Sequence, residues 1–246
     1  MKLKLLGTGG YHPTELRHTA CLMLPEAGVV LDAGTGMFRV PAHLVTDELD
    51  IFITHAHLDH VVGLTYLLGL LYGRRMARVT VHGEKAKLVA VREHLFAEEL
   101  FPVPPQFELR PLTAEVSLAD GGKMTWFPLI HLGGSVGYRL DWPGHSMAYV
   151  TDTTAEPSAE YIEHIRGVDL LVHECNYPEG YAEMAKSQGH SHIGAVADVA
   201  RRAGVGRLIL THIDPHATGM DPLNLAAARK IFPSLEMGQD GMSVEF

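Results

Sequence analysis

The most constraining feature of this chain is the stretch at residues 54–63, which reads THAHLDHVVG. It places four potential metal ligands within six positions, namely His55, His57, Asp59 and His60. The stretch directly follows an apolar run at residues 51–53, which predicts a buried strand. Because alternate side chains of an extended segment share one face, His55 and His57 point the same way and can hold one metal ion.

The second half of the stretch predicts a second ion. The chain turns there into an apolar, helix-like run that begins near Val61, and this turn directs Asp59 and His60 toward another point. Imidazole nitrogens and carboxylate oxygens suit Zn, Mn or Fe, and the lack of Cys among these positions disfavours a closed structural zinc site. Zn is the expected metal, with Mn or Fe as alternatives. Separate polar residues at a strand end are the competing interpretation, and four ligands in so short a window argue against it.

Five further motifs follow along the chain. They read HLGGSVGYR from His131, TDT around Asp152, HECNY at residues 173–177, GHSH at residues 189–192 and LTHI at residues 210–213. The first stretch resembles the His-x-His-x-Asp-His signature of the metallo-β-lactamase superfamily, and the ordered set resembles its ribonuclease Z branch. This resemblance spans nearly the whole chain and implies a metal-dependent hydrolase.

The resemblance also implies a ligand set for two ions. The first ion would be held by His55, His57 and His131, and the second by Asp59, His60 and His212. Asp152 would bridge the two ions. Outside this set, Asp32 is either a buried carboxylate that bonds a ligand histidine or an ordinary turn or cap residue.

Two cations about 3.5–4 Å apart can share a hydroxide and clamp the oxygens of an in-line displacement, which is phosphodiester chemistry. Asp59 can in addition orient that hydroxide for attack. His190 lies outside the ligand set, so it can protonate the leaving alkoxide or stabilise the phosphorane charge, with Glu174 holding its other nitrogen. His192 is the alternative to His190, because the Gly-His-Ser-His sequence leaves the choice open.

The fold class expected is α/β, a four-layer αβ/βα sandwich that forms one domain over residues 1–246. Apolar strands that end in His or Asp recur along the chain, so several strands deliver ligands to one end of a sheet. Helices are predicted over residues 61–72, 84–96 and near 158–165. A further helix is predicted to open at the Gly-His-Ser-His motif and to end at Ala203.

The substrate expected is a small or nucleotide-like phosphodiester. The formal net charge of −9 disfavours an extended nucleic-acid surface, because such binding is driven by Lys and Arg. Ribonuclease Z enzymes of the bacterial type carry a tRNA-gripping arm between the third ligand motif and the bridging Asp. Here the interval from His131 to Asp152 is filled by two strands and a turn. The short interval and the sequence GQDGM at residues 238–242 look more like the small cyclic-phosphate phosphodiesterases, although only Cys21 stands where those proteins have a cysteine-rich zinc site.

Three alternatives to this function remain. They are hydrolysis of another ester (a lactone, thioester, sulfate ester or β-lactam), a ribonuclease Z-type tRNA endonuclease, and a non-catalytic metal-binding protein. The N-terminal apolar stretch is too short for a signal peptide and no apolar run approaches a membrane span, so a cytoplasmic location without membrane contact is expected. The apolar run at residues 61–72 has more leucines than one helix face needs, which predicts either a homodimer or complete burial within the monomer.

Overall fold

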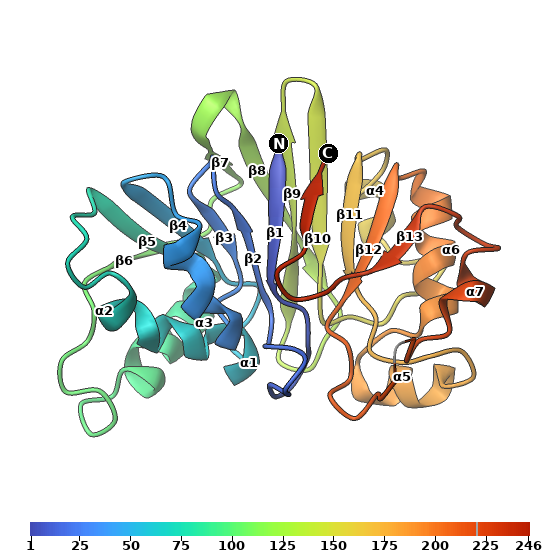
Figure 1. The fold of residues 1–246 in the computed structure, drawn as a ribbon, viewed down its shortest axis with the longest axis horizontal. Coiled ribbons are helices and arrows are strands. Elements are labelled where there is room, and N and C mark those ends of the chain that lie inside the picture. Colours follow the sequence, from blue (N-terminus) through green and yellow to red (C-terminus); the bar gives the residue numbers. More distant parts are fainter. Residues whose placement is uncertain (220) are drawn as a thin grey trace.

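Two packed β-sheets with helices on both outer faces form the protein in the computed structural model, which describes residues 1–219 and 221–246 (Figure 1). Within these residues each sheet has seven strands. The first sheet has the order β14-β1-β2-β3-β4-β5-β6, with strands β14 (Ser243–Glu245), β1 (Lys2–Gly7), β2 (Cys21–Leu24), β3 (Val29–Leu31), β4 (Glu48–Phe52), β5 (Arg78–Gly83) and β6 (Glu108–Pro111). The second has the order β13-β12-β11-β10-β9-β8-β7, with strands β13 (Leu235–Met237), β12 (Arg207–Thr211), β11 (Leu170–Glu174), β10 (His145–Val150), β9 (Ser135–Trp142), β8 (Lys123–Leu129) and β7 (Glu115–Ser117).

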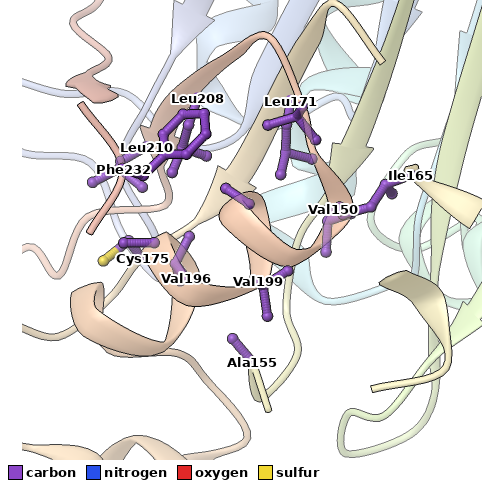
Figure 2. Close-up of a cluster of buried hydrophobic side chains, with 14 of the residues drawn as sticks. Val150, Ala155, Ile165, Leu171, Cys175, Val196, Val199, Leu208, Leu210 and Phe232 are labelled. Carbon is purple, nitrogen blue, oxygen red and sulfur yellow. The ribbon is translucent and has the colours of Figure 1, made fainter. Parts of the chain in front are cut away.

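Three layers of buried apolar side chains hold these elements together. The central layer lies between the sheets and includes Phe52, Tyr138 and Tyr149. One outer layer joins the first sheet to its helices. The other joins β10, β11 and β12 to the helix α6 (Ile193–Ala203), and Figure 2 shows Val196 and Val199 of that helix among the strand side chains. The predicted αβ/βα sandwich is therefore confirmed.

Apart from the segments at residues 58–70, which are described below, the remaining helices are short. They are η1 (Thr35–Ala42), α3 (Lys85–Ala90), η3 (Val91–Leu95), η4 (Ala119–Gly121), α4 (Tyr161–His164), α5 (Ala182–Gln188) and α7 (Leu225–Ala228). The helix predicted over residues 84–96 is confirmed as α3 continued by η3. The one predicted near 158–165 is shorter than expected and forms only α4. Within the described residues, none of the helices combines the length and apolar character that crossing a membrane requires.

The prediction of a single helix over residues 61–72 is wrong. The chain instead forms α1 (Leu58–Val61), a 3₁₀ segment η2 (Val62–Tyr66) and α2 (Leu67–Leu70). Gly63 explains the break, because its N–H donates to the Ala33 carbonyl at 2.7 Å and so leaves the helical register. A Cβ at Gly63 would lie 2.3 Å from the Gly34 carbonyl oxygen, so this close approach requires glycine.

The Gly-His-Ser-His motif also differs from its prediction. Helix α6 begins at Ile193, and His192 before it is extended, with φ −104° and ψ 156°. His190 therefore does not open the helix. It lies in the connection that follows α5, which ends at Gly189 in a left-handed conformation.

Strand direction brings the motifs to one edge of the molecule. Strands β10, β11 and β12 are parallel, and β3, β4 and β5 are parallel in the other sheet. Their carboxyl ends lie at the lower edge in Figure 1, where α1 and α5 are also found, whereas both chain termini lie at the upper edge. The interval from His131 to Asp152 is the β9–β10 hairpin, as predicted.

Candidate metal centre

The predicted ligands come from separate loops at this lower edge and meet in two clusters that share Asp152. The first cluster contains His55, His57, His131 and Asp152, and the second contains Asp59, His60 and His212. A third overlapping group joins His190 to Asp152 and His212. The structure thus brings together all seven residues of the predicted ligand set.

The first cluster is built from ring nitrogens around one carboxylate oxygen. His55 Nε2 lies 3.7 Å and His131 Nε2 3.6 Å from Asp152 Oδ2. His57 Nδ1 lies 3.4 Å from His131 Nε2, and His57 is the solvent-exposed member of the group. One side of the cluster therefore faces solvent.

The second cluster is tighter and more buried. His60 Nε2 and His212 Nε2 are 3.3 Å apart, and each faces Asp59 Oδ2, at 3.4 and 3.3 Å. The other oxygen of Asp152, Oδ1, lies 3.2 Å from His60 Nε2 and 3.4 Å from His212 Nε2. The two oxygens of Asp152 thus face different clusters.

These distances fit divalent cations. Ligands about 2.1 Å from a tetrahedral zinc ion are about 3.4 Å from one another, close to the spacings found in both clusters. The Nε2 atom of His55 is buried and has no hydrogen-bond partner among the described residues, although it faces the centre of the first cluster. A buried polar atom without a partner is costly, and a bound cation would satisfy it.

Charge supports the same conclusion. Burial lowers the pKa of His55 well below its ordinary value, with a further contribution from the neighbouring His60, so the His55 ring is neutral and can act as a ligand. Burial would also lower the pKa of His60, but the carboxylates of Asp152, Asp59 and Asp32 outweigh it and raise that pKa well above the ordinary value. A pocket with this excess of negative charge suits a divalent cation.

The carboxylate of Asp32 is connected by hydrogen bonds to one histidine of each cluster. His60 Nδ1 donates to Asp32 Oδ2 at 2.8 Å, which leaves His60 Nε2 free for the second cluster. Thr54 Oγ1 lies 3.0 Å from Asp32 and 3.0 Å from His55 Nδ1, so the hydroxyl relays the same constraint to the first cluster. Tyr149 Oη also donates to Asp32, at 2.9 Å. Of the two interpretations of Asp32, the structure supports the carboxylate that bonds a ligand histidine.

His190 and His192 lie in different surroundings. His190 Nδ1 is 3.0 Å from Glu174 Oε1, and its ring stacks on His212 with centroids 5.2 Å apart. Burial lowers the pKa of His190, but Glu174 more than compensates and raises it to about 9. His192 instead faces Glu179 at 3.4 Å. The geometry therefore favours His190 as the histidine beside the metal centre.

Glu174 itself is fixed from several directions. Its Oε1 accepts from the Thr153 N–H at 2.8 Å, and its Oε2 accepts from the Ser191 N–H at 3.1 Å. The side chain is completely buried. It can therefore hold the imidazole of His190 in one orientation.

Two features of the centre were not predicted. The N–H of Tyr11 donates to Asp59 Oδ2 at 2.9 Å, and Gly10 packs directly on the His212 ring. Asp240, near the C-terminal end of the chain, accepts from the Thr8 N–H and holds the same loop. The glycines at residues 7, 9 and 10 permit a close backbone approach to a site, but nothing in the sequence links them to Asp240.

Comparison with known proteins places these observations in a wider context. A sequence model described as "Beta-lactamase superfamily domain" matches residues 28–213. Ribonuclease BN of Enterobacter sp. (strain 638) is 30% identical over 309 aligned positions, which cover 99% of this chain and 99% of that protein. Because 309 positions exceed the 246 residues of this chain by 63, that relative has at least 63 residues with no counterpart here.

Solved structures show the same fold at lower identity. The metallo-β-lactamase fold protein YhfI from Bacillus subtilis superimposes with a TM-score of 0.78 and 19% identity, with 99% of each chain covered. A diphosphatase from the PhnP family superimposes with a TM-score of 0.75 and 23% identity, covering 100% of this chain and 97% of the other.

Proposed function

Because the chain belongs to the metallo-β-lactamase superfamily of hydrolases, in its ribonuclease Z-like branch, we propose that it is a dinuclear metal-dependent phosphodiesterase. Its substrate would be a small or nucleotide-like phosphodiester. The observation that carries the proposal is the placement of Asp152, whose two oxygens face two separate clusters of ring nitrogens at 3.2–3.7 Å. Such an arrangement suits a pair of cations that share one carboxylate.

The metal would be held by the residues of the two clusters. His55, His57 and His131 would bind the first ion, Asp59, His60 and His212 the second, and Asp152 both. Zn is the metal proposed, since imidazoles dominate the ligand set. Two divalent ions held there would activate water as a nucleophile and neutralise charge on the diester oxygens.

The other steps would depend on protein groups. Asp59 Oδ2 lies 3.3 Å from His212 Nε2 within the second cluster, and we propose that it accepts a hydrogen bond from the attacking water. His190 lies beside Asp152 and stacks on His212, and it would donate a proton to the leaving oxygen. Glu174 would stabilise the charged imidazole and fix its orientation.

A small substrate is favoured over tRNA. The relative named ribonuclease BN has at least 63 residues that this chain lacks, and the interval between His131 and Asp152 is only a hairpin. The net charge of −9 would also repel a polyanion from most of the surface. The name of that relative still makes RNA cleavage the second candidate.

The proposal is tested by metal analysis followed by turnover on matched substrates. We expect two metal ions per chain. The rate of hydrolysis of bis-p-nitrophenyl phosphate, a diester, should be well above that of p-nitrophenyl phosphate, a monoester. A thioester, a lactone and a precursor tRNA belong in the same panel. Two bound metals with turnover on a thioester or lactone alone would refute the phosphodiesterase, and efficient cleavage of the tRNA would favour the ribonuclease.

A further inference from the structure

The loop between β1 and β2 presents one side chain that neither packing nor folding accounts for. We propose that the ring of Tyr11 is a stacking platform for the nucleobase of the substrate, beside the second metal cluster. The inference rests on the proposed function and narrows its substrate class from small diesters in general to nucleotides. It is carried by the backbone conformation, exposure and position of Tyr11.

The first observation is the strained backbone of Tyr11. Its φ is +59°, in the left-handed region that bulky side chains rarely adopt. Its ring is nevertheless 77% exposed, so no core packing offsets the strain. Glycine or asparagine would make the same turn at lower cost. Strain of this kind at the edge of an active site indicates that the side chain itself has a use.

The second observation is the position of the loop against the metal centre. The N–H of Tyr11 donates to Asp59 Oδ2 at 2.9 Å, and Gly10 N–H donates to the Ile213 carbonyl at 3.0 Å. A Cβ at Gly10 would lie 2.5 Å from the His212 ring, so the backbone touches a second ligand. The backbone at residues 10 and 11 therefore contacts two ligands of the second cluster, and the Tyr11 side chain begins at the edge of that cluster.

The third observation is that the loop is held in place from its base. Asp240 Oδ1 accepts from the Thr8 N–H at 3.0 Å and its Oδ2 accepts from the His18 N–H at 2.7 Å. Arg39 donates to the same Oδ2 at 2.8 Å. The base of the loop is thus held around the nearly buried carboxylate of Asp240, which fixes the backbone that carries Tyr11.

The neighbouring side chains extend the aromatic surface. His12 meets the Tyr11 ring edge-on with centroids 5.6 Å apart, and His216 meets His12 in the same manner, also at 5.6 Å. Every nucleobase offers a π-face, whereas a sugar phosphate without a base offers none. A nucleotide placed with its phosphate at the metal centre can therefore stack on this surface, to which Tyr11, 77% exposed, contributes one ring.

The test compares two ligands that share a ribose and a phosphate but differ in the base. Calorimetric titration of the metal-loaded protein with AMP and with ribose 5-phosphate would measure the preference directly. We expect AMP to bind roughly tenfold more tightly or better, from base stacking on one aromatic side chain. The Tyr11→Phe variant keeps this preference, and Tyr11→Gly loses it.

Two controls separate the ring from the loop. Glycine adopts a positive φ without strain, so Tyr11→Gly should melt at or above the wild-type temperature, and its lost preference cannot then be due to unfolding. Leu16→Ala removes another exposed side chain of the same loop and should leave the AMP preference unchanged.

Three results would overturn the inference: equal affinity for AMP and ribose 5-phosphate, no binding of either, or a preference that survives in Tyr11→Gly. Because the readout is binding, it is independent of turnover on bis-p-nitrophenyl phosphate. A protein that cleaves diesters without preferring AMP would disprove the platform alone, whereas an AMP preference without diester cleavage would disprove the proposed phosphodiesterase alone.

Discussion

At the scale of single residues, one buried carboxylate links the two halves of the centre. Asp32 bonds His60 directly and reaches His55 through the hydroxyl of Thr54. Each of these bonds occupies an Nδ1 atom, so the Nε2 atoms of both rings face the clusters, where they can bind a metal ion. Such outer partners raise the basicity of a ligand and fix its orientation.

Replacing Asp32 tests this role. We expect Asp32→Asn to lower the affinity for both metal ions by roughly 10- to 100-fold, because the amide fixes neither ring as firmly as the carboxylate. Titration of the metal-free protein with Zn²⁺ against a chelating indicator measures the effect. Asp169→Asn is the matched control, since Asp169 accepts from the Ser146 N–H and hydroxyl away from the centre. Unchanged affinity in Asp32→Asn would show that the metal site does not need this carboxylate.

A second prediction at this scale separates two histidines of one motif. His190→Gln should retain two metal ions per chain and lose roughly 100- to 10,000-fold in kcat on a diester, the usual contribution of a positioned proton donor. His192→Gln should keep most of the activity, because His192 faces Glu179 and not the metal centre. Metal analysis and steady-state kinetics of the two variants measure this. Equal losses of kcat in the two variants would show that His190 is not the specific proton donor.

Sequence reasoning works well for the ligands and less well for their supports. Imidazoles and carboxylates at strand ends are recognisable because the chemistry requires those side chains at close spacing. The link between Tyr11 and Asp59 is made by a backbone N–H, which any residue except proline has. Asp240 reaches Thr8 across 232 positions of sequence, and no local pattern marks such a pair. These contacts join segments far apart in the sequence and form only once the strands of the first sheet have paired.

At the scale of elements, β4 and β5 are joined by charges as well as by their ladder. Asp50 accepts from Arg78 at 2.7 and 2.8 Å, and from His82 Nε2 at 2.7 Å. Partial burial would raise the pKa of Asp50, but the bonds from His82 and Arg78 outweigh it and lower that pKa to about 2. The ionised carboxylate therefore stabilises the folded state.

The sign of the pH dependence follows. Because the folded pKa of Asp50 lies below its ordinary value, the stabilisation is complete above about pH 4 and is lost as the pH falls toward 2. We expect Asp50→Asn to cost roughly 2 kcal/mol of unfolding free energy at pH 7 and much less near pH 2. Urea denaturation of both proteins across this range measures the difference. Glu48→Gln is the control, since Glu48 pairs with the same Arg78 but is more than half exposed. If the loss of unfolding free energy in Asp50→Asn did not change with pH, the ionised Asp50 carboxylate would not be the source of the stabilisation.

Helix lengths show where local patterns are insufficient. The apolar run at residues 61–72 has the composition of a helix, yet the bond from Gly63 to Ala33 interrupts it. The strands are predicted better, because a strand shows itself in a short sequence window, either as alternating apolar and polar residues or as a continuous apolar run. The helix break is decided by contact with Ala33 and Gly34, which lie about 30 positions earlier in the chain.

At the scale of the whole molecule, one groove lies away from the metal centre, lined by apolar side chains together with Arg74, Arg78 and Glu108. It has a volume of about 610 Å³ and is lined by residues that include Leu67, Leu68, Leu71, Tyr72 and Phe107. Tyr72 is 89% and Leu68 49% exposed, so the extra leucines of residues 61–72 are not all buried within the monomer. Exposed apolar side chains gathered in this way are typical of an interaction surface.

The predicted homodimer places a second copy on this groove. Light scattering should then give a mass of twice 26.9 kDa, and Tyr72→Glu together with Leu68→Glu should return the mass to that of one chain, because buried charges disfavour the interface. Ile231→Glu, which adds the same charge at an exposed apolar position on the other half of the molecule, should leave the dimer intact. Since the groove lies between α2 and β6 and not at the carboxyl ends of β10–β12, the monomeric variant should keep both metal ions and most of its diesterase activity. A wild-type mass of 26.9 kDa would contradict the dimer.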